Sequence, residues 1–336
     1  MNNKHVAATL AWKLACSFGI LAGAFLLAML FGAKETTLHD LWQALTWQAS
    51  QKNEVMVLRE LRLPREIGAL LIGAAFAVSG AIMQGVTRNP LADPGLLGLT
   101  AGANMALAAA FAFIPGISYT GIMAACFVGA ALGAGLVLIM SSARRGGLSP
   151  FRVVLAGAAV SAFLYAIASG ISLVFKISKD VSMWTAGGLI GTSWEQVAPI
   201  APVIVVAIVI ALLLSNQLNI LSLSEEVAIG LGQKQGRIKL VMFLLVIVMT
   251  GAAVALVGNM AFVGLMIPHM IRRFTGTDYR ILLPVSAVAG GTFMMLADTL
   301  GRTINSPYET PVAAIVAMIG LPFFLFVVHK GGKTLS

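Results

Sequence analysis

The sequence predicts an all-α membrane protein, a single transmembrane domain over residues 1–336 with about ten membrane-spanning helices. Hydrophobic residues make up 59% of the chain and charged residues only 10%, whereas water-soluble domains carry about a quarter charged residues. The mean hydropathy is +0.93. Apolar stretches of about 18 residues or more, long enough to cross a bilayer as a helix, recur along the chain.

Ten spans are predicted from these stretches. The first follows Lys4 and Lys13 and is long for the apolar core of a cleaved signal peptide, so we interpret it as a retained helix. The third and eighth are short or interrupted. The spans are placed near residues 12–32, 64–86, 94–113, 119–141, 150–174, 194–214, 236–257, 260–273, 281–300 and 309–329.

The distribution of basic residues predicts that both termini are cytoplasmic. An even number of spans puts the two termini on one side, and positive charge gathers on the cytoplasmic loops of membrane proteins. The opposite side balances its basic residues with acids. The residues that fall on the side of Lys4 are Arg88, Arg144, Arg145, Arg152, Lys234, Arg237, Lys239, Arg272, Arg273, Arg280, Lys330 and Lys333.

Composition also argues against several other classes of site. The formal charge of +9 comes from residues scattered between apolar spans, which favours sidedness over nucleic-acid binding. Cys16 and Cys126 lie in apolar stretches and predict no disulfide framework. The four histidines are far apart and have no metal-ligand spacing, so no metal site is predicted.

Two segments outside the spans have clear local signals. Residues 33–63 look helical and amphipathic, and we expect them to lie along the outer surface. In the segment "RNPLADPGLLGLTAGA" (88–103), Asn89-Pro90 breaks the second span, and Asp93 followed by Pro94 is a typical helix start. The glycines at 95, 98 and 102 predict a face that another helix approaches closely, and no phosphate-binding loop motif occurs.

A polar segment, residues 216–237, is predicted to form a capped cytoplasmic helix. Ser222 and Glu225 have the spacing of a capping box, and Gly230 and Gly232 are placed to end the helix.

Five motifs in order carry a family resemblance: "LRLPR" (61–65), the 88–103 segment, "FVGLMIPHMIRRFTG" (262–276), "RILLPVSAVAG" (280–290) and "LADTLGR" (296–302). Together they resemble the permease subunits of ABC importers for ferric siderophores, haem and vitamin B12, and are most similar to iron-hydroxamate permeases. The signature positions are Arg88, Asn89, Pro90, Asp93, Pro94, Gly98, Pro268 and His269.

The resemblance implies the type II ABC importer permease fold in a bacterial cell membrane. It implies a second permease subunit, identical or paralogous, two ABC ATPase subunits, an external substrate-binding protein and an iron-siderophore substrate. ATP and Mg²⁺ are expected in the ATPase and no cofactor in this chain, which is expected to be a transport subunit and not an enzyme.

The resemblance also assigns roles to residues. Arg62, Arg65 and Arg302 match positions that dock the binding protein. Contact with lipid headgroups is the alternative for the first two, and an ion pair with Asp298 for Arg302. Ser149, Pro150 and Phe151 fall at the cytoplasmic gate. ATPase coupling is implied for Leu223, Glu225, Ala228, Leu231 and Gly232, against the alternative of an ordinary cytoplasmic helix.

Other functions fit the sequence less well. Vitamin B12 or haem is the alternative substrate within the same family. An ion-coupled secondary transporter needs carboxylates inside the membrane, and Asp298 is the one strong candidate. An intramembrane enzyme needs paired catalytic residues, and no such motif is present.

Overall fold

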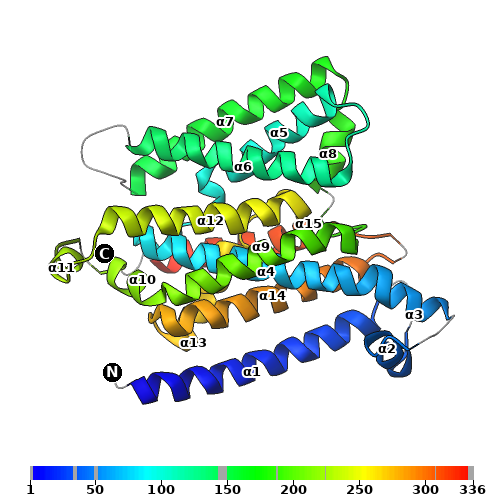
Figure 1. Ribbon diagram of the computed structural model, residues 1–336, viewed down its shortest axis with the longest axis horizontal. Helices are drawn as coiled ribbons and strands as arrows, with labels where there is room; N and C mark the ends of the chain where they lie inside the picture. The colour runs from blue at the N-terminus through cyan, green and yellow to red at the C-terminus, as the bar shows by residue number, and fades with distance from the viewer. Residues whose placement is uncertain are drawn as a thin grey trace.

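The computed structural model describes residues 3–32, 36–48, 52–142, 150–186, 188–223, 225–306 and 308–331, which form helices joined by turns, with no strand in these ranges (Figure 1). Eight helices of the described chain are long and apolar enough to span a membrane. They are α1 (Asn3–Leu30), α4 (Leu63–Thr87), α6 (Tyr119–Ser142), α7 (Pro150–Val174), α9 (Trp194–Leu213), α12 (Gln235–Val257), α14 (Tyr279–Thr303) and α15 (Val312–Gly331).

Two shorter helices take the third and eighth places of the predicted order. α5 (Leu99–Phe113) has 15 residues and α13 (Val263–Thr275) has 13. Both are too short to cross about 30 Å of hydrocarbon unaided, and both lie against other helices. Membrane proteins tolerate such interrupted helices where the free backbone is buried in protein.

The second span differs from its prediction. It runs without a break from Asn53 to Thr87, through α3 (Asn53–Val57), a π-helical turn (Leu58–Arg62) and α4. The charges in "LRELRLPRE" had placed its start near residue 64. The helix continues through them because Arg62, Arg65 and Glu66 are buried and bonded to other parts of the protein.

The centre of the bundle is the antiparallel pair α4 and α14. Glycines let the two backbones meet: a Cβ atom on Gly73 would lie 2.1 Å from the carbonyl oxygen of Gly290. A Cβ atom on Gly80 would lie 1.8 Å from the carbonyl oxygen of Gly264 in α13. Contacts of this kind replace the hydrophobic effect, which supplies no drive between helices in lipid. The α4–α14 pair is therefore packed backbone to backbone and runs the length of the molecule.

The helices α5, α6 and α7 form a layer that packs on α12 through α6 and α5 (Figure 1). The α5–α6 contact uses the predicted glycine face in part, since Gly102 meets Gly129 and Gly98 meets Gly133 backbone to backbone. Gly95 lies outside that face, in the 3₁₀ turn Pro94–Leu97, where its N–H donates to Asp93 Oδ1 at 2.7 Å. Asp93 is thus the predicted cap, and Gly98 (φ +71°) separates the turn from α5.

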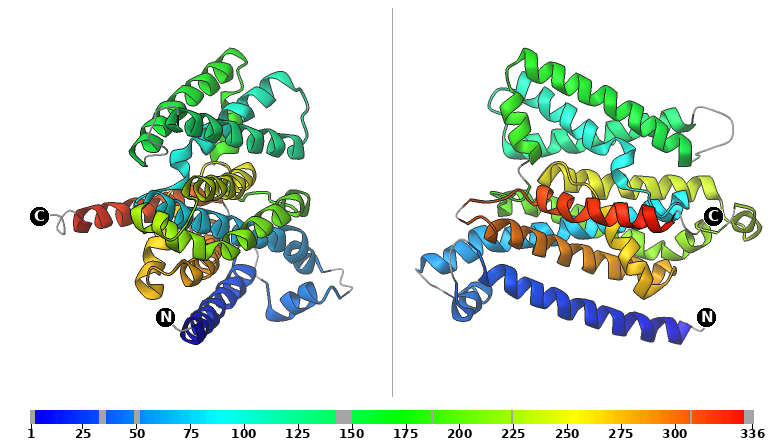
Figure 2. Two further views of the ribbon diagram at one scale, coloured as in Figure 1. Left: turned by 60° about the vertical axis from the view of Figure 1, so that its left-hand side comes forward. Right: turned by 180° about the vertical axis from the view of Figure 1, so that it is seen from behind.

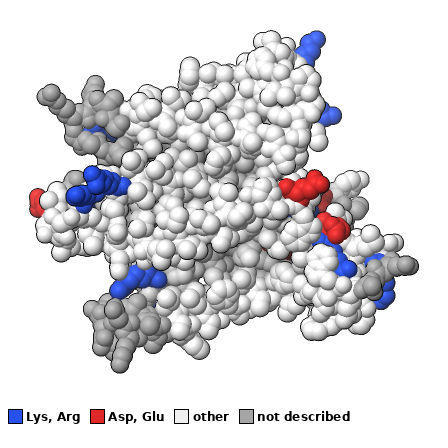
Figure 3. Space-filling model, viewed as in Figure 1, with Lys and Arg blue, Asp and Glu red and all other residues white. Residues whose placement is uncertain are grey.

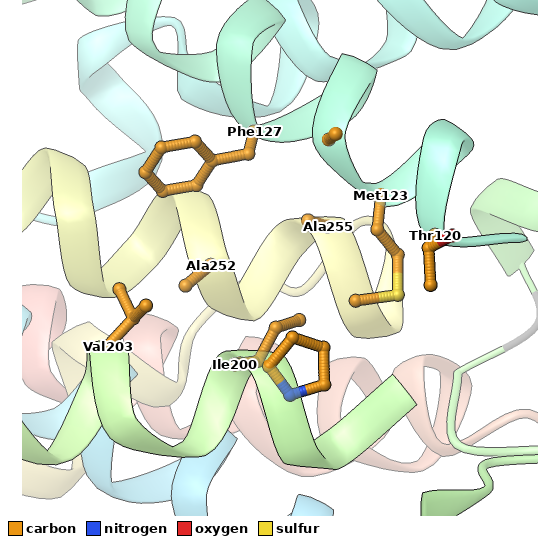
Figure 4. Close-up of a pocket in the computed structure, with 9 residues that line it drawn as sticks. Thr120, Met123, Phe127, Ile200, Val203, Ala252 and Ala255 are labelled. Atoms are coloured by element: carbon orange, nitrogen blue, oxygen red, sulfur yellow. The ribbon is translucent and has the colours of Figure 1, made fainter. Parts of the chain in front are cut away.

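The faces of the bundle differ in what covers them. α1 packs on α14. Most residues in the apolar spans of α1, α7 and α15 are not buried by the rest of the protein. Between α6, α9 and α12 a lateral groove is lined by Met123 and Phe127 on one side and Ile200 and Val203 on the other (Figure 4). Its walls are hydrocarbon, so it suits a lipid tail and not a polar chelate.

The two ends of the molecule are distinct. Both termini and α11 (Glu225–Gly230) lie at one end, the proximal end, and α2 (Leu38–Leu45) and α3 lie at the other, the distal end (Figures 1 and 2). At the distal end, α2 buries Leu41 and Ala44 against Val55 and Leu58. Arg59 ties α2 to the π-helical turn, because its guanidinium donates to the carbonyl oxygens of residues 43, 44 and 48.

Candidate functional sites at the two ends of the bundle

The proximal end carries an elbow, which we define as α10 (Ser215–Leu221), α11 and the connection to Lys234. Within the elbow, α11 projects beyond the long helices, whereas α10 packs against α4 and α14 (Figure 1). Gly230 is the last residue of α11, and Gly232 (φ +77°) turns the chain toward α12, as the sequence predicts. Gln233 holds the turn closed, since its Nε2 donates to the Gln217 carbonyl oxygen at 2.7 Å.

The start of the elbow helix differs from the predicted capping box. α11 begins at Glu225, so Ser222 lies outside its first turn. Ser222 instead ends α10, where its hydroxyl donates to the Asn219 carbonyl oxygen at 2.7 Å. The chain makes two short helices where the sequence predicted one capped helix, because α10 is anchored separately to the bundle.

That anchor joins the elbow to both central helices. Arg88, at the end of α4, donates from Nε and Nη2 to the Leu221 carbonyl oxygen at 3.2 and 3.1 Å. Asn219 donates to Asp278 Oδ1 at 2.8 Å and accepts from the Tyr279 N–H at 2.8 Å, where α14 begins. Any displacement of the elbow therefore acts directly on the proximal ends of α4 and α14.

Asp278 is the charged member of this anchor. The Arg280 side chain donates to both of its carboxylate oxygens, at 2.7 to 3.1 Å. These bonds, followed by the one from Asn219, lower the pKa of Asp278 to about 2. The carboxylate is thus ionised at every physiological pH and caps α14 through the Arg280 N–H.

The elbow presents an apolar surface at an end of the molecule that is rich in charge. Leu223 and Ile229 are exposed, and the Leu231 side chain is 61% exposed, whereas Ala228 is fully buried. Lys and Arg side chains dominate this end on the face shown in Figure 3, and the distal end there mixes acids with bases. Exposed apolar side chains rimmed by polar ones mark a surface for a partner protein. Of the residues assigned to coupling, Ala228 faces the protein interior.

The distal end holds a cluster of six charged side chains, the distal cluster: Arg62, Arg65, Glu66, Asp298, Arg302 and Glu309. Asp298 lies between two arginines. Its oxygens accept from Arg65 Nε and Nη2 at 2.8 and 2.9 Å, and Oδ2 lies 3.1 Å from Arg302 Nε. The ion pair predicted between Asp298 and Arg302 is thus present, and Arg65 joins it from α4.

The remaining members of the cluster complete its charge balance. Arg302 Nη2 donates to Glu66 Oε1, and Arg65 Nη1 donates to Glu309 at 2.9 and 3.1 Å. Arg62 donates to the Met29 carbonyl oxygen and, at 3.0 Å, to the Thr36 hydroxyl. Three cations meet three anions here, which keeps the cost of burying charge low.

Burial separates the three carboxylates. The side chains of Glu66 and Asp298 are 0% and 1% exposed, but that of Glu309 is 31% exposed. Glu309 lies at the rim of a cavity of about 320 Å³ that Arg62, Arg65 and Arg302 line together with the turn at Gly191 and Thr192. The three arginines assigned to docking thus share one cavity, and none of them lies on the outer surface.

Asp298 does not have the surroundings of an ion-coupling carboxylate. Such a group must bind and release a proton or cation during transport. Asp298 is instead held between two guanidinium groups, those of Arg65 and Arg302. The residue that made a secondary transporter worth considering therefore has a structural role in the described chain.

The segment between α7 and α9 closes the distal end next to this cluster. It forms α8 (Ser178–Ala186), and Trp194 Nε1 donates to the Arg59 carbonyl oxygen at 2.9 Å. Trp184 packs on Tyr119 with ring centroids 4.6 Å apart. Both tryptophans therefore tie this part of the chain to its neighbours at the distal end.

The other signature residues have identifiable local roles. Arg88 adopts a left-handed conformation (φ +53°), and Asn89 Oδ1 accepts from the Leu91 N–H in a tight turn. Pro268 lies within α13, and the ring of His269 packs edge-on against Phe323 at 5.8 Å. At the predicted gate, Pro150 and Phe151 are the first residues of α7, and Ser149 lies outside the described residues.

A match to a protein-family model identifies the family of this chain. The model of the FecCD transport family matches residues 20–330. The chain belongs to the FecCD transport family. The match covers both the elbow and the distal cluster, so both are parts of the family domain.

Individual relatives agree with this assignment. The chain is 42% identical over 308 residues to the iron(3+)-hydroxamate import system permease protein FhuB of Bacillus subtilis, covering 92% of this chain and 80% of that one. It is 38% identical over 305 residues to the ferric enterobactin transport system permease protein FepD of Escherichia coli, covering 90% and 91%. A solved structure of a transporter classed as metal-chelate type ABC, in an inward-facing conformation, superimposes with a TM-score of 0.81 at 28% identity, covering 96% and 99%. This FecCD chain is accordingly a multi-pass membrane protein with an ABC importer permease fold.

Sequence reasoning missed two members of the distal cluster, Glu66 and Glu309. Glu66 follows Arg65 directly and had been counted only as an acid that balances the outer charge. Glu309 lies 244 positions from Arg65, and nothing local indicates the pairing. Glu66 directly follows the motif at 61–65 and Glu309 lies beyond the motif at 296–302, so neither acid was part of the resemblance.

Proposed function

We propose that this FecCD chain is the membrane-spanning subunit of an ATP-driven importer that moves a ferric hydroxamate from an external binding protein into the cytoplasm. The observation that carries the proposal is the 42% identity, over 92% of the chain, with an iron-hydroxamate permease. The functional complex contains two permease subunits, two ABC ATPases and one binding protein. ATP and Mg²⁺ bind to the ATPases, and both termini of this chain are cytoplasmic.

The elbow is the surface on which the ATPase acts. Its exposed Leu223, Ile229 and Leu231 offer an apolar contact of the kind that a groove on a partner binds. The bonds from Arg88 and Asn219 pass a movement of that contact to α4 and α14. In this proposal, ATP-driven closure of the ATPases reaches the distal end through the α4–α14 pair.

The distal cluster is the surface that receives the binding protein. Its cavity is lined by three arginines, and a guanidinium group can bind a carboxylate through two parallel hydrogen bonds. Acidic side chains on the binding protein are the natural ligands for Arg62, Arg65 and Arg302. Because Arg62 and Arg65 lie at the start of α4 and Arg88 directly follows its last residue, one helix links the docking surface to the elbow.

Uptake of labelled iron tests the substrate. The full-length chain is expressed with its ATPase and binding protein in bacteria that lack their own siderophore, haem and vitamin B12 permeases. Accumulation of radioactive iron from a ferric hydroxamate is expected, with little from a ferric catecholate or haem and no uptake of labelled vitamin B12. Preferential uptake of one of the other substrates would replace ferric hydroxamate while leaving the permease function in place.

A further inference from the structure

The second carboxylate on Arg65 is the feature that goes beyond docking itself. We propose that Glu309 is a displaceable placeholder, which occupies the outward donor of Arg65 in the free permease and gives it up to a carboxylate of the binding protein. This inference rests on the proposed docking role of Arg65. It adds a residue that sets the affinity of docking.

The geometry of Arg65 leaves one position for exchange. Its Nε and Nη2 donate to the two oxygens of Asp298, which is almost fully buried. Both oxygens of Glu309 lie on the remaining nitrogen, Nη1, at 3.1 and 2.9 Å. A docking carboxylate that binds at Nη1 must therefore displace Glu309, whereas the Asp298 side chain, 1% exposed, stays in place.

The Glu309 carboxylate can move away from Arg65 without a change in the backbone. Its backbone is fixed by its neighbour, since the Thr310 N–H donates to the Gly301 carbonyl oxygen at 2.9 Å. Its side chain lies at the cavity rim and is already 31% exposed. Rotation of that side chain alone moves the carboxylate from Arg65 into water.

Charge balance gives the exchange its direction. The distal cluster holds three arginines and three carboxylates, so a fourth carboxylate from a partner makes the buried group net negative. Release of Glu309 into solvent restores the balance at the moment of docking. The placeholder also keeps the distal cluster neutral while no binding protein is present.

The test measures affinity for the binding protein. The permease–ATPase complex is placed in lipid nanodiscs, and the probe is the binding protein whose addition stimulates ATP hydrolysis by that complex. Glu309→Gln should tighten binding about three- to tenfold, because the competitor is a partly exposed ion pair of modest strength. Glu60→Gln is the matched control, since it removes one exposed acid from the same end without touching Arg65.

A second background tests whether the effect passes through Arg65. In Arg65→Gln, the gain from Glu309→Gln should vanish, because there is no guanidinium left to compete for. If Arg65→Gln does not assemble, the double variant Arg65→Gln/Asp298→Asn, which keeps the cluster neutral, takes its place.

The outcomes separate this inference from the docking role on which it rests. Binding by Glu309→Gln equal to that by Glu60→Gln, or a gain that persists without Arg65, overturns the placeholder. Wild-type binding by the Arg65 variant overturns the docking role itself.

Discussion

Neutralising Asp298 should destabilise the protein more than neutralising any exposed acid. Asp298→Asn keeps the size of the side chain but removes the charge shared by Arg65, at 2.8 and 2.9 Å, and Arg302, at 3.1 Å. The distal cluster then holds three cations and two anions, so one positive charge is left uncompensated among buried groups. Breaking a buried ion pair from one side costs about 3–5 kcal/mol.

The assay is unfolding of the purified protein by SDS in mixed micelles, followed by circular dichroism. Asp298→Asn should lower the free energy of unfolding by about 3 kcal/mol or more, a factor above 100 in the unfolding equilibrium. Glu309→Gln, at the partly exposed acid of the cluster, should lower it by at most about 1 kcal/mol. Glu60→Gln, which is exposed, should leave it unchanged.

A double-mutant cycle identifies the cause. Arg65→Gln/Asp298→Asn removes one charge of each sign and leaves the cluster balanced, so the two single effects should not add, with a coupling energy of about 2–3 kcal/mol. Additive effects, or an Asp298→Asn variant as stable as Glu60→Gln, would refute the reasoning that charge balance maintains this site.

Three further predictions concern the elbow and the helix contacts. Leu231→Asp should abolish copurification of the ATPase with a folded permease, measured by affinity pull-down. The control Met183→Asp, which changes an equally exposed residue of α8, should retain copurification. Equal loss in both variants would contradict a contact at the elbow. Gly102→Ala should prevent stable folding, because its Cβ would lie 2.1 Å from the Gly129 carbonyl oxygen. The control Gly135→Ala, whose Cβ meets nothing within 4 Å, should be neutral or stabilising by about 1 kcal/mol in thermal unfolding. Equal thermal stability of the two variants would count against the close approach. The pKa of Asp278 is lowered from 3.8 to about 2, so the stabilising effect of its carboxylate is complete above pH 3.8 and is lost as the pH falls toward 2. The difference in melting temperature between wild type and Asp278→Asn should therefore be constant from pH 8 to 5. A difference that changes across that range would be inconsistent with the low pKa.

The sequence predicts the helical class and the order of spans because each span is long and apolar on its own. It also predicts local caps, and Asp93 and Gly232 adopt the expected conformations. It failed where distant parts of the chain change a local signal. The helix of the second span continues through Arg62, Arg65 and Glu66 because Met29, Asp298 and Arg302 bind them, and no window of sequence contains those partners.

The sites follow the same division. The motif resemblance selected Arg65 and Arg302 together, and the structure places both against Asp298. It selected neither Glu66 nor Glu309, because each carboxylate pairs with an arginine that is distant in the sequence and close only in the folded structure. Ser222 shows the converse, since correct spacing for a capping box is overridden when α10 binds elsewhere in the bundle.

Reconstitution tests the central proposal, that this FecCD chain moves its substrate with energy supplied by a partner. Proteoliposomes that contain the permease, its ATPase and the external binding protein should accumulate ferric hydroxamate when ATP is supplied to the ATPase side, and should stop when the ATPase is omitted. Accumulation by the permease alone, driven by a proton or sodium gradient without ATPase or ATP, would contradict the proposal.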